Sequence, residues 1–127
     1  MDENVKRSLI ENYIAAYNSF DIDGMMAVLH SDIEFKNVSS GEVNVTASGV
    51  KEFRQLAEYS KELFRSRRQT VISSWSNPDQ TTIEVAFEGT LAFGLQNGMK
   101  AGETLRLNGR SEFTFRDEKI CRIIDVS

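Results

Sequence analysis

The sequence is poor in the residues on which several classes of protein depend. Its single cysteine, Cys121, excludes an intrachain disulfide framework, favours a reducing compartment and is interpreted as a strand residue rather than a nucleophile. Its single histidine, His30, excludes metal sites that need several imidazoles, and any Ser-His-Asp triad would require it. Because His30 lies at a predicted helix-to-strand junction, we interpret it as a capping or packing residue.

Long hydrophobic runs and concentrated positive charge are also missing. No stretch approaches the ~18 apolar residues of a membrane span, and the N-terminal MDENVKRSLIENY lacks the apolar run of a signal peptide. We therefore expect a cytoplasmic protein without a membrane partner. The formal net charge of −4 opposes a general role in nucleic-acid binding, which needs a strong positive field. The one basic cluster, Arg65, Arg67 and Arg68, is interpreted as a solvated helix end whose cations complement the helix dipole.

What remains is an ordinary globular composition. The 127 residues contain 40% hydrophobic and 27% charged residues and a single proline, with no internal repeat and no linker. A chain of this length buries about two thirds of the surface that its unfolded form exposes. The sequence therefore predicts one domain over residues 1–127, folding alone or as a small oligomer.

Helical periodicity dominates the N-terminal half. In the first predicted helix, apolar residues recur every three or four positions, and Asp21 or Asp23 can cap a second helix that Ser31-Asp32 ends. A third helix opens at Ser48-Gly49. The three predicted apolar faces are Val5, Leu9, Tyr13, Ala16 and Phe20; Met25, Met26, Val28 and Leu29; and Phe53, Leu56, Ala57, Ser60, Leu63 and Phe64.

Alternation typical of strands appears first at Ile33, Phe35 and Asn37 and is followed by a polar loop from Ser39. From residue 69 onward it continues through a turn at 77–80, a Gly-containing loop at 94–102 and a turn at 116–119. Val71, Ser73 and Trp75 are predicted to share one face of their strand. Helices first and a meander afterwards indicate an α+β domain in which three N-terminal helices wrap a curved antiparallel sheet.

The last predicted strand, KICRIIDVS, does not alternate cleanly. Cys121, Ile123 and Asp125 are assigned to one face, and Ile120, Ile124 and Val126 to the other. Apolar residues on both faces indicate that both are buried. Since the helices cover only one face of the sheet, we expect a homodimer that packs through the other.

In these features the chain resembles the nuclear transport factor two-like superfamily, which includes ketosteroid isomerase-like and SnoaL-like proteins. The residues that carry the resemblance are Tyr13 to Asn18, Asp21 to Gly24, Leu29 to Phe35, Gly49-Val50, Phe113 to Phe115 and Lys119-Ile120. The resemblance covers essentially the whole chain. It implies a cone-shaped, cystatin-like α+β roll with a deep pocket for a small hydrophobic molecule between the helices and the concave sheet.

The ketosteroid isomerase branch implies an oxyanion-donating tyrosine, a carboxylate base and a second donor. Tyr13 matches the tyrosine, the base position falls on Asn37, and the second donor position falls on Ser111. An amide cannot take a proton from carbon at neutral pH. No efficient steroid isomerisation is therefore expected.

Two further branches offer other chemistry. SnoaL-like cyclases resemble this chain in a strand that ends on an acidic residue after a Lys-Ile pair, which makes Asp125 a candidate acid and base. Epoxide hydrolases of the superfamily use an Asp-Arg-Asp arrangement that Arg110 and Glu112 superficially resemble, but these two are assigned to the outward face as a surface ion pair. The loops around Gly41 and Gly94 to Gly102 lack the strand-turn-helix setting of phosphate cradles, so no nucleotide cofactor is implied.

The sequence and the resemblance together predict a site without a cofactor or a metal ion. Tyr13 and Asp125 are the candidate catalytic residues. The candidate ligand-binding residues are Tyr17, Phe35, Asn37, Phe53, Trp75, Phe87, Ser111 and Phe113. One hypothesis is a cofactor-independent cyclase, isomerase or hydratase acting on a polyketide-like or steroid-like molecule, and the other is a non-catalytic ligand-binding or association domain. A pocket carboxylate with a raised pKa would favour the enzyme.

Overall fold

The computed structural model describes all residues, 1–127, as three helices and a six-stranded sheet. The elements in chain order are α1 (Glu3–Asn18), α2 (Ile22–Ala27), β1 (Leu29–Ser39), β2 (Glu42–Ser48), α3 (Gly49–Leu63), β3 (Phe64–Ser76), β4 (Thr81–Leu91), β5 (Thr104–Arg116) and β6 (Lys119–Val126). The strand order is β2-β1-β6-β5-β4-β3, and only the β1–β6 pair is parallel. The predicted α+β class is confirmed.

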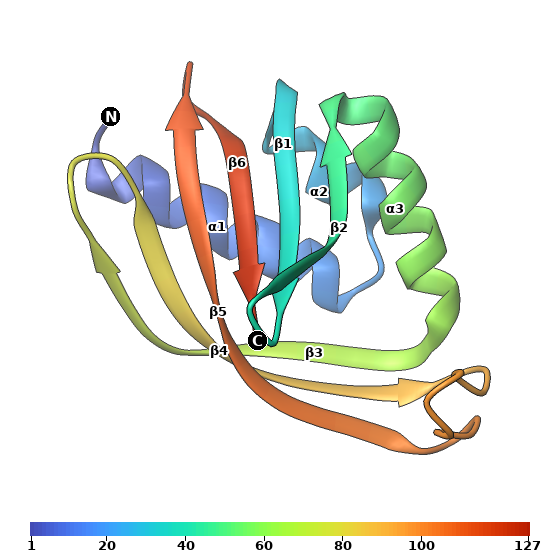
Figure 1. Cartoon of the computed structure of the whole chain (residues 1–127). Helices are drawn as coiled ribbons and strands as arrows, with labels where there is room; N and C mark the ends of the chain where they lie inside the picture. The colour runs from blue at the N-terminus through green and yellow to red at the C-terminus, as the bar shows by residue number, and fades with distance from the viewer.

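The sheet is strongly curved, and the helices lie on its concave side (Figure 1). α1 crosses behind the central strands, while α3 packs beside β1 and β2. Five large side chains of the core between these layers are almost completely buried: Phe113, Ile33, Ile83, Ile120 and Ile123. No helix has the length and apolar character needed to cross a membrane.

Local sequence explains where the first helices begin and end. The Asp2 carboxylate accepts a hydrogen bond from the Asn4 N–H at the start of α1, and the Asp21 carboxylate accepts one from the Gly24 N–H at the start of α2. The buried face of α1 is rotated slightly from the predicted one and consists of Lys6, Ile10, Tyr13, Ile14 and Ala16. The second helix is shorter than predicted because Leu29 already begins β1.

The segment after Ser39 is a strand, β2, and not the predicted loop. Ser40 and Gly41 both have positive φ (53° and 80°), as in the two-residue turns that match the twist of paired strands. β2 then pairs antiparallel with β1. The alternation of Val43, Val45 and Ala47 is the signal that could have identified it.

A β-bulge corrects the predicted faces of the last strand. Phe115 pairs with Ile120 and Thr114 pairs with Arg122, which leaves Cys121 as an extra residue. The bulge lets Ile120 and Ile123 point to the same side, and both are 0% exposed. The bulge thus removes Ile120 from the outward apolar face on which the expected homodimer depended. Because Ile124 and Val126 still face outward, the homodimer stays a prediction.

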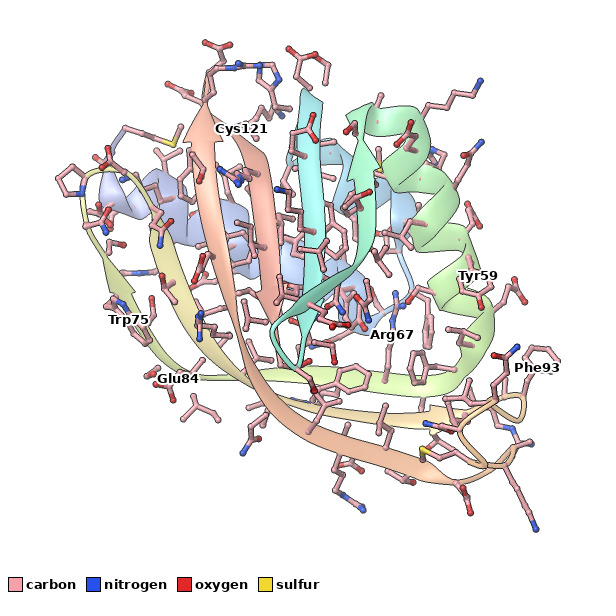
Figure 2. The ribbon with its side chains drawn as sticks, viewed as in Figure 1. Tyr59, Arg67, Trp75, Glu84, Phe93 and Cys121 are labelled. Atoms are coloured by element: carbon pink, nitrogen blue, oxygen red, sulfur yellow. The ribbon has the colours of Figure 1, made fainter.

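A second bulge, at Ile72 in β3, changes the direction of Trp75. Val71 pairs with Val85 and Ser73 pairs with Glu84, so the residues after the bulge change face. Trp75 is therefore 49% exposed on the outer surface, where Figure 2 shows it near Glu84 and far from Arg67. Trp75 therefore lies outside the two cavities that Asp125 lines and borders a separate hollow of about 610 Å³ between α1 and the β3–β4 hairpin.

The basic cluster belongs to β3 and not to a helix end, because α3 ends at Leu63. Arg65 and Arg68 are exposed, as predicted, but Arg67 points inward and is only 5% exposed. The period-two series Arg67, Gln69 and Val71 is the sequence signal for this face.

Candidate functional site

Two adjoining cavities occupy the space between the helices and the concave sheet. The inner cavity, about 280 Å³, lies between α1, α3 and β1, and the outer one, about 410 Å³, lies where the C-terminal end of β6 meets the bend of β3, β4 and β5. Four residues line both: Tyr17, Asn37, Gln69 and Asp125. Most of the remaining wall of the inner cavity is apolar. The polar groups are thus concentrated where the two cavities meet.

Asp125 is the acidic group of this shared wall. Its position on β6 pairs with Ser111 on β5 and with Asn37 on β1. The Ser111 hydroxyl donates a hydrogen bond of 2.6 Å to Asp125 Oδ1. Burial raises the pKa of the Asp125 carboxyl to about 6, and the hydrogen bond from Ser111 opposes that rise. Asp125 can therefore hold or release a proton near neutral pH.

Removal of the Ser111 hydroxyl tests this assignment. We expect Ser111→Ala to raise the pKa of Asp125 further, because the hydroxyl donates to the charged form of the carboxyl and stabilises it. Titration of the Asp125 carboxyl carbon by ¹³C NMR measures the change. An unchanged or lower pKa in the variant would contradict the hydrogen bond.

The two tyrosines of α1 lie one turn apart beside this carboxyl. The Tyr13 ring is 6% exposed and packs edge-on against Phe113, with 6.1 Å between ring centroids. Burial raises the pKa of Tyr13 well above its ordinary value, and the negative charge of Asp125 adds to the effect. The Tyr13 hydroxyl therefore stays protonated and can donate a hydrogen bond. Burial also raises the pKa of Tyr17, with Arg67 opposing it.

The remaining predicted residues divide between the cavities and the core. Phe35 and Phe53 pack edge-on at 5.8 Å and line the inner cavity, and Phe87 lines the outer one. The Asn37 amide donates to Asn44 Oδ1 at 2.8 Å and faces both cavities. Phe113 lies behind Tyr13, is 0% exposed and lines neither cavity. It is a core residue that packs under the Tyr13 ring and is flanked in the sheet by its register partners Thr81 and Ile123.

Three residues considered from the sequence lie at the surface or the rim. Arg110 and Glu112 form the predicted surface ion pair, with Arg110 Nε 3.0 Å from Glu112 Oε2. The His30 ring lies 3.2 Å from Asp117 Oδ2 at the β5–β6 turn and lines neither cavity. No cluster of three or more His, Cys, Asp or Glu side chains could hold a metal ion.

Arg67 and Gln69 are two polar wall residues that the sequence did not predict. Arg67 Nε donates to the Tyr17 carbonyl at 2.9 Å, and its guanidinium lies 3.8 Å from the centroid of the Tyr17 ring. Asn18 fixes the backbone of Gln69 through two hydrogen bonds, of 2.7 and 3.1 Å. These contacts attach the C-terminal end of α1 to the edge strand β3. The site thus brings together the Asp125 carboxyl, the Tyr13 and Tyr17 phenols, the Arg67 guanidinium and the Asn37 and Gln69 amides.

Comparison with known proteins gives a consistent assignment. The family of SnoaL-like domains matches residues 10–123. A proposed polyketide cyclase from Xanthomonas campestris pv. campestris is similar in structure, with a TM-score of 0.84, 21% identity and coverage of 98% of this chain and 90% of that one. A protein with a ketosteroid isomerase-like fold from Catenulispora acidiphila, in complex with trimethylamine, has a TM-score of 0.75, 14% identity and coverage of 92% and 82%. A cystatin-fold protein from Novosphingobium aromaticivorans has a TM-score of 0.75, 13% identity and coverage of 100% of both chains. The sequence matches no curated protein.

Proposed function

The chain belongs to the family of SnoaL-like domains, and we propose that it is a cofactor-independent enzyme that moves a proton on a small apolar carbonyl compound. One observation carries the proposal: a carboxyl with a pKa raised to about 6, Asp125, lines both cavities between the helices and the sheet. A group with this pKa is present in both protonation states near neutral pH and can act as base and then as acid. An all-neutral pocket would have favoured simple binding.

The position of Asp125 also explains how the site can contain a base although Asn37 occupies the base position of the ketosteroid isomerase branch. Asn37 cannot accept the proton, but Asp125 is its register partner on the neighbouring strand. The carboxylate therefore enters the cavity one strand away. Such a shift changes which substrate atom the base can reach, so isomerisation of the steroid type is not the reaction we propose.

The chemistry assigns one role to each group. Ionised Asp125 removes a proton from the carbon next to a carbonyl, and the electron pair of the broken C–H bond moves onto the carbonyl oxygen as an enolate. The Tyr13 hydroxyl, which stays protonated, donates a hydrogen bond to that oxygen. The enolate carbon then attacks a second carbonyl, whose C=O electron pair moves onto its oxygen, and a ring closes. In a substrate with a C=C bond next to the enolate, the proton instead adds to a different carbon of the conjugated system, which moves the double bond. Protonated Asp125 returns the proton in both cases.

Proton exchange provides a test without knowledge of the natural substrate. We expect the purified protein to accelerate exchange of the α-protons of 2-tetralone with D₂O, followed by ¹H NMR. The rate should rise as Asp125 ionises through pH about 6 and level off above it. Binding of 2-tetralone without exchange above the buffer rate would support the alternative, a non-catalytic ligand-binding or association domain.

Tyr13→Phe is the corresponding test of the donor. We expect a loss of about tenfold to hundredfold in the exchange rate with little change in KM, because the hydroxyl acts on the enolate more than on the ketone. The ring still packs against Phe113, so the melting temperature should change little. A variant with full activity would remove Tyr13 from the mechanism.

A further inference from the structure

The guanidinium of Arg67 is buried with one donor group unused. The residue is 5% exposed and makes two hydrogen bonds, from Nε to the Tyr17 carbonyl at 2.9 Å and from Nη1 to Ser60 Oγ at 3.3 Å. The Tyr17 and Phe20 rings pack against the guanidinium. Nη2 is buried and has no hydrogen-bond partner. It is the one buried side-chain nitrogen or oxygen of the chain in this condition. An unused donor on a charged group costs free energy unless a ligand engages it.

The positive charge also lacks a counter-ion within the protein. No carboxylate lies within 4.0 Å of Arg67, since the six ion pairs of the chain involve other residues. The Tyr17 carbonyl, in the last turn of α1, supplies only the partial negative charge of a helix C-terminus. Removing one partner of a buried ion pair is strongly destabilising, because it leaves a buried charge without compensation. A buried cation that has no partner in the protein is therefore seldom retained without a role.

A strained backbone at Phe20 helps to hold the surroundings of Arg67 in place. Phe20 has a φ of 58°, a left-handed conformation that usually suits glycine after a helix. The Phe20 N–H donates to the Tyr17 carbonyl and the Asp21 N–H donates to the Ala16 carbonyl, at 3.2 and 2.8 Å. A phenylalanine at this position is strained relative to glycine. Its ring lies 4.5 Å from the guanidinium, so the strained residue covers Arg67.

Arg67 and Asp125 both line the inner cavity, where Tyr17 also lies, and neither is paired with the other. The lining of this cavity also includes the apolar residues Phe35, Phe53 and Leu56. A ligand that fits this space meets a cation, an apolar surface and the proton-carrying carboxyl. We propose that Arg67 is the anchor for a carboxylate on a small apolar ligand. The inference rests on the proposed function, because the ligand that Arg67 holds is the one on which Asp125 acts.

A matched pair of probes tests the anchor directly. At pH 7.5 we expect 2-naphthoate, which is ionised, to bind the full chain at least about tenfold more tightly than 2-naphthamide, which has the same shape and no charge. Isothermal titration gives both values of Kd. Arg67→Gln should remove the preference by weakening naphthoate alone, while Arg68→Gln, on the exposed face of the same strand, should leave it unchanged. Equal affinities in the unmodified protein, or a preference that survives in Arg67→Gln, would overturn the proposal.

A spectroscopic measurement keeps the test decisive if Arg67→Gln does not fold. In the unmodified protein, the side-chain Nε–H signal of Arg67, assigned by its loss in Arg67→Lys, should move on addition of naphthoate and not of naphthamide. A signal indifferent to naphthoate contradicts the anchor. Asp125→Asn separates the two proposals, because it should lose exchange of 2-tetralone and keep the preference for naphthoate. Exchange without the preference refutes the anchor alone, and the preference without exchange refutes the enzyme alone.

Discussion

Asp125→Asn is expected to lower the exchange rate of 2-tetralone by about a hundredfold to ten-thousandfold, the usual contribution of a positioned acid or base. Asparagine has nearly the same shape as aspartate and can still accept the hydrogen bond from Ser111 Oγ, 2.6 Å away in the structure. The cavity should therefore keep its form and lose only the proton carrier. Binding of 2-tetralone measured by isothermal titration should change little, which assigns the loss to the chemical step.

The same variant should be more stable than the unmodified protein at pH 8. Folding raises the pKa of Asp125 from 3.8 to about 6, so the native state binds the proton more tightly than the unfolded state does. Stability then falls as the pH rises from about 4 through about 6, and the full penalty is present above that range. By linkage it amounts to up to about 3 kcal/mol, since one pKa unit corresponds to ~1.4 kcal/mol. Asparagine does not ionise, so the variant avoids this loss of stability.

Urea unfolding at pH 4 and pH 8 measures this effect. The stability difference between Asp125→Asn and the unmodified protein should be near zero at pH 4 and favour the variant at pH 8. Asp79→Asn is the matched control, because it removes a carboxylate that is exposed in the β3–β4 turn instead of a buried one. A variant that is less stable at pH 8 would mean that the Asp125 charge is stabilised in the fold, and its role as a proton carrier near neutral pH would lose its basis.

The fold could be predicted from the sequence because periodicity reports which face of each element is buried. The 3.6-residue pattern around Tyr13 and Phe53 identified α1 and α3, and the alternation after residue 69 identified β3 to β6. The extra residues Ile72 and Cys121 could not be predicted, because a bulge depends on pairing with the neighbouring strand. Each bulge reverses the faces that follow it, which is why Trp75 lies outside the two cavities that Asp125 lines.

The site was predictable only in part for the same reason. Alternation placed Asn37 and Ser111 on inward faces, and the resemblance singled out Asp125, but the register that joins the three on adjacent strands is a property of the assembled sheet. The arginines at 65, 67 and 68 are assigned to a helix end from the sequence, but they are too few to show a period that distinguishes a helix end from a strand. Only the packing of β3 against α1 shows that Arg67 is buried.

Phe113→Ala is expected to destabilise the protein by about 3–5 kcal/mol, the usual cost of removing a fully buried aromatic ring. Phe113 is 0% exposed, supports the Tyr13 ring edge-on and lies between β4 and β6, so the surrounding backbone cannot close the space left behind. Phe93→Ala, at a side chain that is 58% exposed, is the matched control and should change stability by less than about 0.5 kcal/mol. Urea unfolding at 25 °C gives both values. A cost below about 1 kcal/mol for Phe113→Ala would mean that this ring borders open space, as the sequence first indicated, and that the cavity extends behind Tyr13.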